Sequence, residues 1–367
     1  MRARLEDVCE RDSSNLRQAD VAGRSGDYPI YGASGYIGNV DFYHQELPYV
    51  AIVKDGAGIG RTVLLPAKSS VIGTMQYLLP KKNVLPEYLC YVVRYMHLEK
   101  YFSGATIPHI YFRDYKSEEF NLVPVDYQEE IVATLGKIEA IEAAHQRQLQ
   151  KLDELVKARF IELFGDMFLN SKAWKKQALD SLADVVSGIT KGRKTKEPQL
   201  IEVPYMAVSN VKDGYIDWTT VKTIQATQQE IEQYRLLPDD VLMTEGGDPD
   251  KLGRGAILKE PLQNCIHQNH IFRVRLNESL ILPAFFEEYL KHQKAKRYFL
   301  GCAKQTTGIA SINMRQLKAL PVLLPPLELQ EQFAAFVEQT DKSKLAVQKS
   351  LEELEILKKS LMQQYFG

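Results

Sequence analysis

The sequence predicts an α+β fold in which two mixed α/β domains, related by internal duplication, are separated by two long helices that pack on each other. Three observations predict this fold. The last part of the first half of the chain is repeated at the end of the second half. Two long stretches contain no proline, and the other segments carry short runs of β-forming residues between Gly and Pro. We expect a first domain over 1–123, a central helix over 124–165, a second domain over 166–323 and a C-terminal helix over 324–367.

The duplication is visible as a gapless register. Residues 106–165 align with 308–367 at a shift of 202 positions, and seventeen of the 60 pairs are identical. The two copies end on the same Phe-Gly, at Phe164-Gly165 and Phe366-Gly367. Further upstream the halves diverge, so the two domains are expected to share an origin but to differ in what they bind.

Two proline-free stretches, 128–163 and 330–365, predict the long helices. Apolar residues recur there at spacings of three and four, which is typical of a coiled-coil seam. A helix of about 36 residues extends roughly 54 Å and is not stable alone with a single apolar stripe, so the two are expected to pack together. The expected seam residues are Ile131, Leu135, Ile138, Leu149, Leu152, Val156, Phe333, Val337, Val347, Leu351, Leu354 and Leu361.

The remaining segments read as mixed domains. Runs such as YVAIV, RTVLL and MQYLL in the first half and IFRVRL in the second predict short strands. LPEYLCYVVRYM and LPAFFEEYLKHQ predict helices that begin at a proline.

Composition excludes several classes of protein. The 367 residues carry 46 Lys+Arg against 47 Asp+Glu, and no stretch is long and apolar enough to predict a membrane span. Four cysteines stand far apart without a CxxC pair, which favours reduced thiols in a cytoplasm. The formal net charge is 0 over 1–123 and +4 over 166–323, whereas both long helices are acidic. A polyanion would therefore have to engage the domains.

No catalytic site is predicted. GAGIGRT at 56–62 is too short for a phosphate loop and carries Arg61 where that motif has lysine. Cys265, His267 and His270 are the one compact set of potential metal ligands, but on a strand 267 and 270 point to opposite faces. We predict neither a catalytic residue nor a metal site.

Several segments resemble the specificity subunit of type I restriction-modification enzymes. The resemblance covers essentially the whole chain and is carried by YPIYGASGYIG, KDGAGIGR, TIPHIYFRDYKSEEFNLVPVDYQEEI and INMRQLKALPVLLPPLELQEQF. It implies that the domains are target recognition domains, each reading one half of a bipartite, asymmetric DNA site. It also implies that the two long helices are packed as an antiparallel coiled coil that spaces these domains. It also implies two methyltransferase (modification) subunits as partners, with restriction subunits that translocate and cut. S-adenosylmethionine and ATP with Mg²⁺ would be bound by those partners, and this chain would carry no cofactor.

Base-reading residues differ among members of such a family, so the candidates come from residue type and place. The candidates are long hydrogen-bond donors in loops, together with the two Arg residues repeated before the helices. These candidates are Lys54, Arg61, His109, Arg113, Lys191, Arg193, Lys194, Lys196, Arg254, Gln305 and Arg315. The repetition of these Arg residues, and of Lys116 and Lys318 beside them, leaves two roles open: a shared structural contact or a shared phosphate contact.

Alternative functions stay open at this point. A non-catalytic adaptor with two binding domains on a coiled coil would bind a protein or another ligand and would show no salt-dependent DNA binding. An enzyme with an unrecognised site would turn over a substrate alone. A specificity subunit could also serve a methylation-only system.

Overall fold

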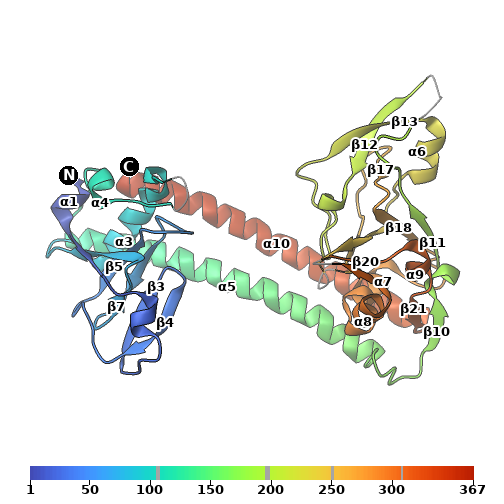
Figure 1. Cartoon of the computed structure of the whole chain (residues 1–367), viewed down its shortest axis with the longest axis horizontal. Helices are drawn as coiled ribbons and strands as arrows, with labels where there is room; N and C mark the ends of the chain where they lie inside the picture. Colours follow the sequence, from blue (N-terminus) through green and yellow to red (C-terminus); the bar gives the residue numbers. More distant parts are fainter. Residues whose placement is uncertain (105–107, 195–198, 249–251, 307–308) are drawn as a thin grey trace. The chain divides into compact units, whose positions relative to one another are not determined.

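The computed structural model describes residues 1–104, 108–194, 199–248, 252–306 and 309–367, without the side chains of 305, 306 and 309. The chain forms two compact units, one made of 1–147 with 347–367 and the other of 148–346 (Figure 1). The unit boundaries thus cut through both long helices, so each unit contains one domain and one half of each helix. In the described residues no helix has the length and hydropathy to cross a membrane.

The first unit is built around an antiparallel four-stranded sheet in the order β2-β8-β5-β6, whose strands span Cys9–Ser13, Met75–Pro80, Tyr49–Val53 and Thr62–Leu65. A three-stranded sheet has the order β4-β3-β7, with Gly35–Val40, Tyr28–Gly32 and Ser70–Val71. β1 (Arg2–Arg4) pairs with β9 (Glu119–Asn121). The helices are α1 (Leu5–Val8), α2 (Gln18–Val21), α3 (Pro86–Tyr95), η1 (Leu98–Tyr101) and α4 (Phe112–Tyr115).

The second unit repeats this plan. Its four-stranded sheet has the order β11-β18-β14-β16, with Ala183–Ser187, Ile271–Leu276, Val241–Thr244 and Gly255–Ile257. The three-stranded sheet β13-β12-β17 comprises Lys222–Ala226, Ile201–Met206 and Ile266–His267, and β10 (Lys175–Ala178) pairs with β21 (Pro321–Leu324). A further sheet, β15-β20-β19, comprises Gly246–Gly247, Ile309–Ser311 and Lys304–Thr306. The helices are η2 (Leu179–Ser181), η3 (Val208–Asn210), α6 (Gln228–Tyr234), α7 (Pro283–Lys291), α8 (Gln293–Cys302) and α9 (Met314–Lys318).

The duplication extends into the part of the chain where sequence identity disappears. β3 pairs antiparallel with β4 and parallel with β7, and β12 pairs antiparallel with β13 and parallel with β17. Strands β5 and β14, in the middle of their sheets, each pair with an antiparallel neighbour on both sides. The two domains therefore keep one topology while their side chains differ, which confirms the predicted fold class.

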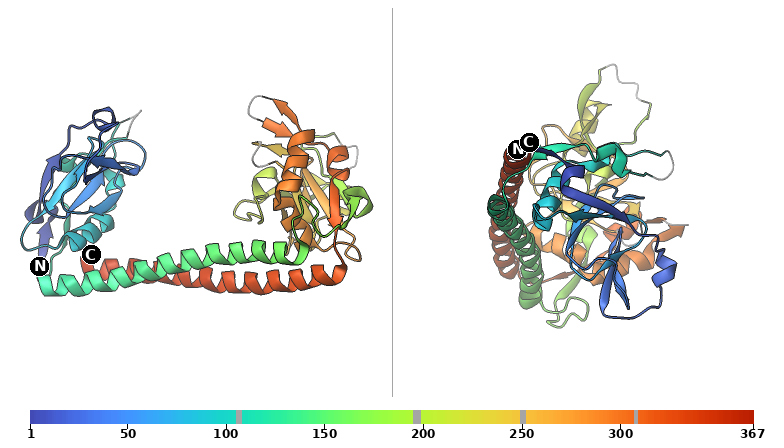
Figure 2. Two further views of the ribbon diagram at one scale, coloured as in Figure 1. Left: turned by 90° about the horizontal axis from the view of Figure 1, so that it is seen from below. Right: turned by 90° about the vertical axis from the view of Figure 1, so that its left-hand side faces the viewer.

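The long helices α5 (Val125–Phe164) and α10 (Leu327–Phe366) have 40 residues each, so each extends beyond the proline-free stretch that predicts it. They pack against each other and run antiparallel: Lys358 contacts Glu142 at 3.0 Å in the first unit, and Lys344 contacts Asp153 at 2.6 Å in the second (Figure 2). In the second unit the ring centroids of Phe160 and Phe333 are 5.3 Å apart. Buried apolar side chains between the two helices, and ion pairs beside them, thus join the helices.

The twelve expected seam residues all lie at least partly out of solvent. Ile131, Leu135, Ile138, Val156, Phe333 and Val347 are buried. The other six, at 149, 152, 337, 351, 354 and 361, are half-buried. The aromatic residues at the helix ends are buried too: Phe164 and Phe366 are fully buried in the cores of the second and first unit.

A buried glutamine fixes the start of each long helix. The Gln128 amide accepts a hydrogen bond from the Leu85 N–H at 2.9 Å and donates to the carbonyls of Asn83 and Val123. Gln330, its repeat equivalent, accepts from the Leu282 N–H and donates to Leu280 and Pro325. Leu85 and Leu282 are the N-caps of α3 and α7, whose first N–H groups need such acceptors. The repeated Gln thus ties each long helix to its domain.

Candidate nucleic-acid interface

Basic side chains gather around a pocket of about 500 Å³ in the first unit. Three of the sequence candidates, Lys54, His109 and Arg113, line it. Arg11 on β2 and Lys116 after α4 also line it and are not among the candidates. Segments far apart in the sequence therefore converge on one cationic site.

The end of β5 and the segment before α4 build this pocket. Lys54 follows β5 directly, and its carbonyl accepts a hydrogen bond from the Ile110 N–H at 3.0 Å. The Gly56 N–H donates to the Pro108 carbonyl, also at 3.0 Å. The side chains of Asp55 and His109 contact each other across the same junction. These contacts hold Lys54 beside the segment that carries His109.

The pocket has more positive than negative side chains: four Lys and Arg residues line it against Glu6 and Asp55. Glu6 is paired with Lys116 at 2.7 Å. The ammonium of Lys54 has no ion-pair partner anywhere in the described chain. The Arg113 guanidinium lies 4.8 Å from the centroid of the Tyr111 ring, and 76% of its side chain is exposed. Such an arrangement suits an anionic or acceptor-rich ligand with an aromatic face.

The second unit has a pocket of about 350 Å³ at the corresponding place, lined by Val208, Glu245, Gly246, His270 and Ser311. Glu245 follows β14 as Lys54 follows β5, and its carbonyl accepts from the Ile312 N–H at 2.9 Å. Its carboxylate pairs with His270. Glu245 is not among the sequence candidates because it lies in the diverged part of the repeat. Ser311 is the repeat equivalent of His109, so the aligned part of the repeat could have identified it.

The lysine-rich loop of the second unit is anchored by Arg193. Its guanidinium forms a bidentate ion pair with Glu230, whose carboxylate also accepts from the Thr227 N–H at the start of α6. This pairing lowers the pKa of Glu230 and raises that of Arg193. Lys191 and Lys194 on either side are exposed, and Lys196 lies outside the described residues. Arg193 therefore holds the described part of this loop against α6, and Lys191 and Lys194 face solvent.

The other candidates lie apart from the pockets. Arg61 is exposed at a turn closed by its N–H to the Gly58 carbonyl at 3.1 Å, and Arg315 is exposed on α9. Arg254 is half-buried, and its Nε has no hydrogen-bond partner among the described residues. The backbone of Gln305 belongs to β19, and its side chain lies outside the described part of the chain.

The repeated lysines before the long helices have matching partners. Lys116 pairs with Glu6 at 2.7 Å, and Lys318 pairs with Asp180 at 3.0 Å. Glu6 and Asp180 precede equivalent strands, β2 and β11. Of the two roles that the repetition left open, a shared structural contact is the one these ion pairs support.

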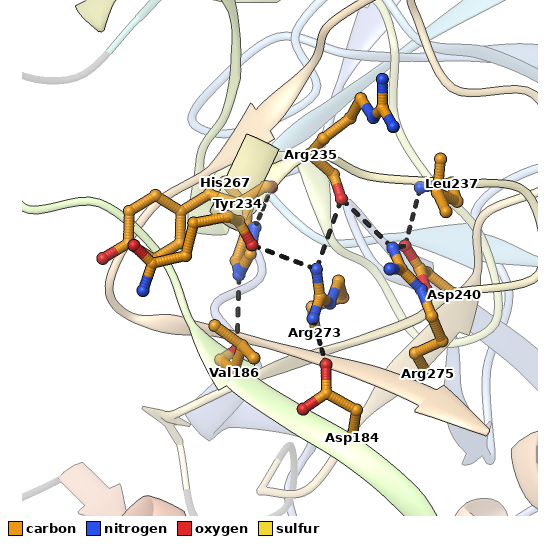
Figure 3. A network of polar contacts seen from close by, with 10 residues as sticks. Asp184, Val186, Tyr234, Arg235, Leu237, Asp240, His267, Arg273 and Arg275 are labelled. Carbon is orange, nitrogen blue, oxygen red and sulfur yellow. Dashed lines mark hydrogen bonds and ion pairs between the residues drawn. The ribbon is translucent and has the colours of Figure 1, made fainter. Parts of the chain in front are cut away.

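A polar network holds the core sheet of the second unit to the segment that follows α6 (Figure 3). Arg273, only 4% exposed, pairs with Asp184 and donates to the carbonyls of Gln233 and Arg235. Arg275, two residues along the same face of β18, pairs with the fully buried Asp240 at 2.7 Å. The alternation in IFRVRL is the sequence signal for these two arginines.

The three potential metal ligands of the second unit, Cys265, His267 and His270, make other contacts or are buried. His267 is buried, with Nδ1 3.1 Å from the Tyr234 carbonyl and Nε2 3.3 Å from that of Val186, and burial lowers its pKa to about 4. Burial raises the pKa of the Cys265 thiol to about 12, and His270 belongs to the pocket with Glu245. Within the described ranges, no three His, Cys, Asp or Glu side chains are placed to hold a metal ion.

The sequence is similar to specificity subunits of type I restriction enzymes. It is 29% identical to the MjaX subunit of Methanocaldococcus jannaschii over 53% of this chain and 45% of that protein. The EcoKI specificity subunit of Escherichia coli is 28% identical over 37% of this chain and 30% of its own length. The matches thus span less than half of these two relatives. The MjaVIII subunit is 22% identical over 85% of this chain and 77% of that protein.

Solved structures share the fold. The type I restriction-modification S subunit from M. genitalium superposes with a TM-score of 0.60 at 15% identity, covering 100% of this chain and 96% of that one. The model of the type I restriction modification DNA specificity domain matches residues 1–154 and 171–356, one copy in each half. The chain therefore belongs to the family of type I restriction-modification DNA specificity proteins.

Proposed function

We propose that this chain reads a bipartite, asymmetric DNA site and directs adenine methylation to it. The observation that carries the proposal is one domain topology present twice, with a cationic pocket in the first copy and a Glu-His pocket in the second. A shared topology suits two half-sites of the same kind, and different pocket linings suit different bases. The half-sites are therefore expected to differ in sequence.

The chemistry belongs to partner subunits in this proposal. The pockets of this chain contain cationic and hydrogen-bonding groups suited to binding, and its cysteine thiols are held protonated by burial, as at Cys9, where the pKa is raised to about 12. S-adenosylmethionine would be bound by the modification subunits, and ATP with Mg²⁺ by restriction subunits. The assembled complex would act on DNA in the cytoplasm.

Two modification subunits would dock on the long helices. Leu155 and Leu357 are identical residues at equivalent positions of the repeat, and each leaves nearly half of its surface exposed, 49% and 47%. Packing within the chain does not account for an exposed leucine that recurs in both copies. Two copies of one partner, each using one of these positions, would account for it.

A duplex selection experiment tests the proposal. The purified complex of this chain with the methyltransferase subunits is incubated with random DNA duplexes, and the retained duplexes are sequenced. We expect two short sequence blocks at a fixed separation, and binding that weakens steeply with added salt. Retention without a common sequence would contradict DNA reading and would favour a protein-binding adaptor.

The restriction subunit is a separate question with its own readout. A complex that methylates the selected site but neither hydrolyses ATP nor cuts unmodified DNA in the presence of all co-encoded subunits would be a methylation-only system. Cleavage dependent on ATP would establish the restriction partner.

A further inference from the structure

Lys54 and Glu245 occupy the same position in the two copies of the domain. Each residue directly follows the central strand of its four-stranded sheet, and each carbonyl accepts a hydrogen bond from the repeat-equivalent isoleucine, Ile110 or Ile312. The next residues pair in the same way: Asp55 bridges to His109, and Gly246 pairs with Ser311. His109 and Ser311 are repeat equivalents. A positive side chain in one copy therefore stands where the other copy has a negative one.

The first pocket presents hydrogen-bond donors. The Lys54 ammonium is free of ion pairs among the described residues. Gln76 on β8 also lines the pocket and is 1% exposed, and its amide nitrogen has no hydrogen-bond partner in the described structure. A buried donor without a partner is costly, so this nitrogen is suited to an acceptor that enters with a ligand. Guanine presents two such acceptors, N7 and O6, in the major groove.

The second pocket presents an acceptor. The Glu245 carboxylate is partly exposed, and its contact with His270 occupies only part of its hydrogen-bonding capacity. The strand pairing of Ile52 with Gln76 corresponds to that of Met243 with Phe272, so an apolar ring replaces the buried amide in the second copy. Carboxylates recognise the amino groups of cytosine and adenine at base edges.

We propose that Lys54 with Gln76 and, at the equivalent place, Glu245 are the residues that make the two half-sites different. The first copy selects a guanine edge through donors, and the second selects a base amino group through its carboxylate. This inference rests on the proposed function and adds the side chains and the base chemistry to it.

Charge reversal at each position tests the proposal. Complexes carrying Lys54→Glu, Lys54→Gln or Glu245→Lys are compared with wild type by duplex selection, and their folding is followed by thermal melting. Lys82→Glu and Glu260→Lys, at exposed positions outside both pockets, are the matched controls. We expect each pocket variant to bind the wild-type site roughly tenfold more weakly and to change the preferred base in one half-site only. Both controls should keep the wild-type sequence.

The outcomes separate this inference from the function on which it rests. If wild type selects no sequence, the proposed function fails. If wild type selects a split site and the Lys54 variants keep its base preference, or if Lys54→Gln weakens binding to all duplexes equally, this inference alone fails. A change of both half-sites by one substitution would contradict it as well.

Discussion

Gln128 shows how a single repeated side chain sets the geometry of a domain. Replacing it with leucine would keep the volume but leave the Leu85 N–H and two carbonyls without partners. Each buried group left unpaired costs about 1–3 kcal/mol, so we expect Gln128→Leu to lower the free energy of unfolding by several kcal/mol. Urea denaturation measures this, with Gln148→Leu, an exposed position on the same helix, as the control. An equal effect of the two substitutions would refute the role.

His267 makes stability depend on pH. Burial lowers its pKa to about 4 from 6.5, so the folded chain binds fewer protons than the unfolded chain below pH 6.5. The contribution of neutral, buried His267 to the free energy of unfolding is therefore complete above pH 6.5 and is lost as the pH falls toward 4. We expect a loss of about 1 kcal/mol between pH 7.5 and 5.5 that His267→Gln abolishes. Urea denaturation at the two pH values is the measurement, and a wild-type slope retained by the variant would count against it.

At the scale of elements, the helix pair depends on aromatic packing at its ends. Phe333 is fully buried against Phe160 and Phe164, with ring centroids 5.3 and 5.6 Å away. Removing a buried phenylalanine costs about 3–5 kcal/mol, so Phe333→Ala should lower the melting temperature of the chain markedly. Leu345→Ala, at an exposed position of α10, should leave it nearly unchanged. Similar melting curves for the two variants would exclude this aromatic cluster as the main contact.

The elements themselves were predictable where local signals are strong. The proline-free stretches with three- and four-residue spacing correspond to α5 and α10, and the proline-led helices correspond to α3 and α7. The order in which the strands of the diverged regions pair was not predictable, because strands such as β3 and β12 pair through their backbones and tolerate any suitable side chain. Identity can therefore disappear while the pairing order persists.

The candidate site could be predicted only in part, for a similar reason. Lys54, His109 and Arg113 follow from residue type and loop position, but their convergence on one pocket depends on contacts between β5 and the segment before α4. The charge of Arg193 makes it a candidate for contact with DNA, but the sequence does not reveal that Glu230, 37 residues away, forms an ion pair with it. Charge alone cannot separate a ligand contact from an internal ion pair.

At the scale of the whole molecule, the two long helices are expected to act as a ruler between half-sites. If α5 and α10 are shortened by the same number of residues, the separation of the two sequence blocks should change while the bases within each block stay the same. Duplex selection with the shortened and wild-type complexes measures both. An unchanged separation in a folded, DNA-binding variant would refute the ruler.

The most direct measurement is modified-base sequencing of DNA from cells that carry this chain with its methyltransferase subunits, and from matched cells that lack this chain. We predict a split, asymmetric motif with N6-methyladenine in both halves, present in the first cells and absent from the second. The same methylation with and without this chain would contradict the account.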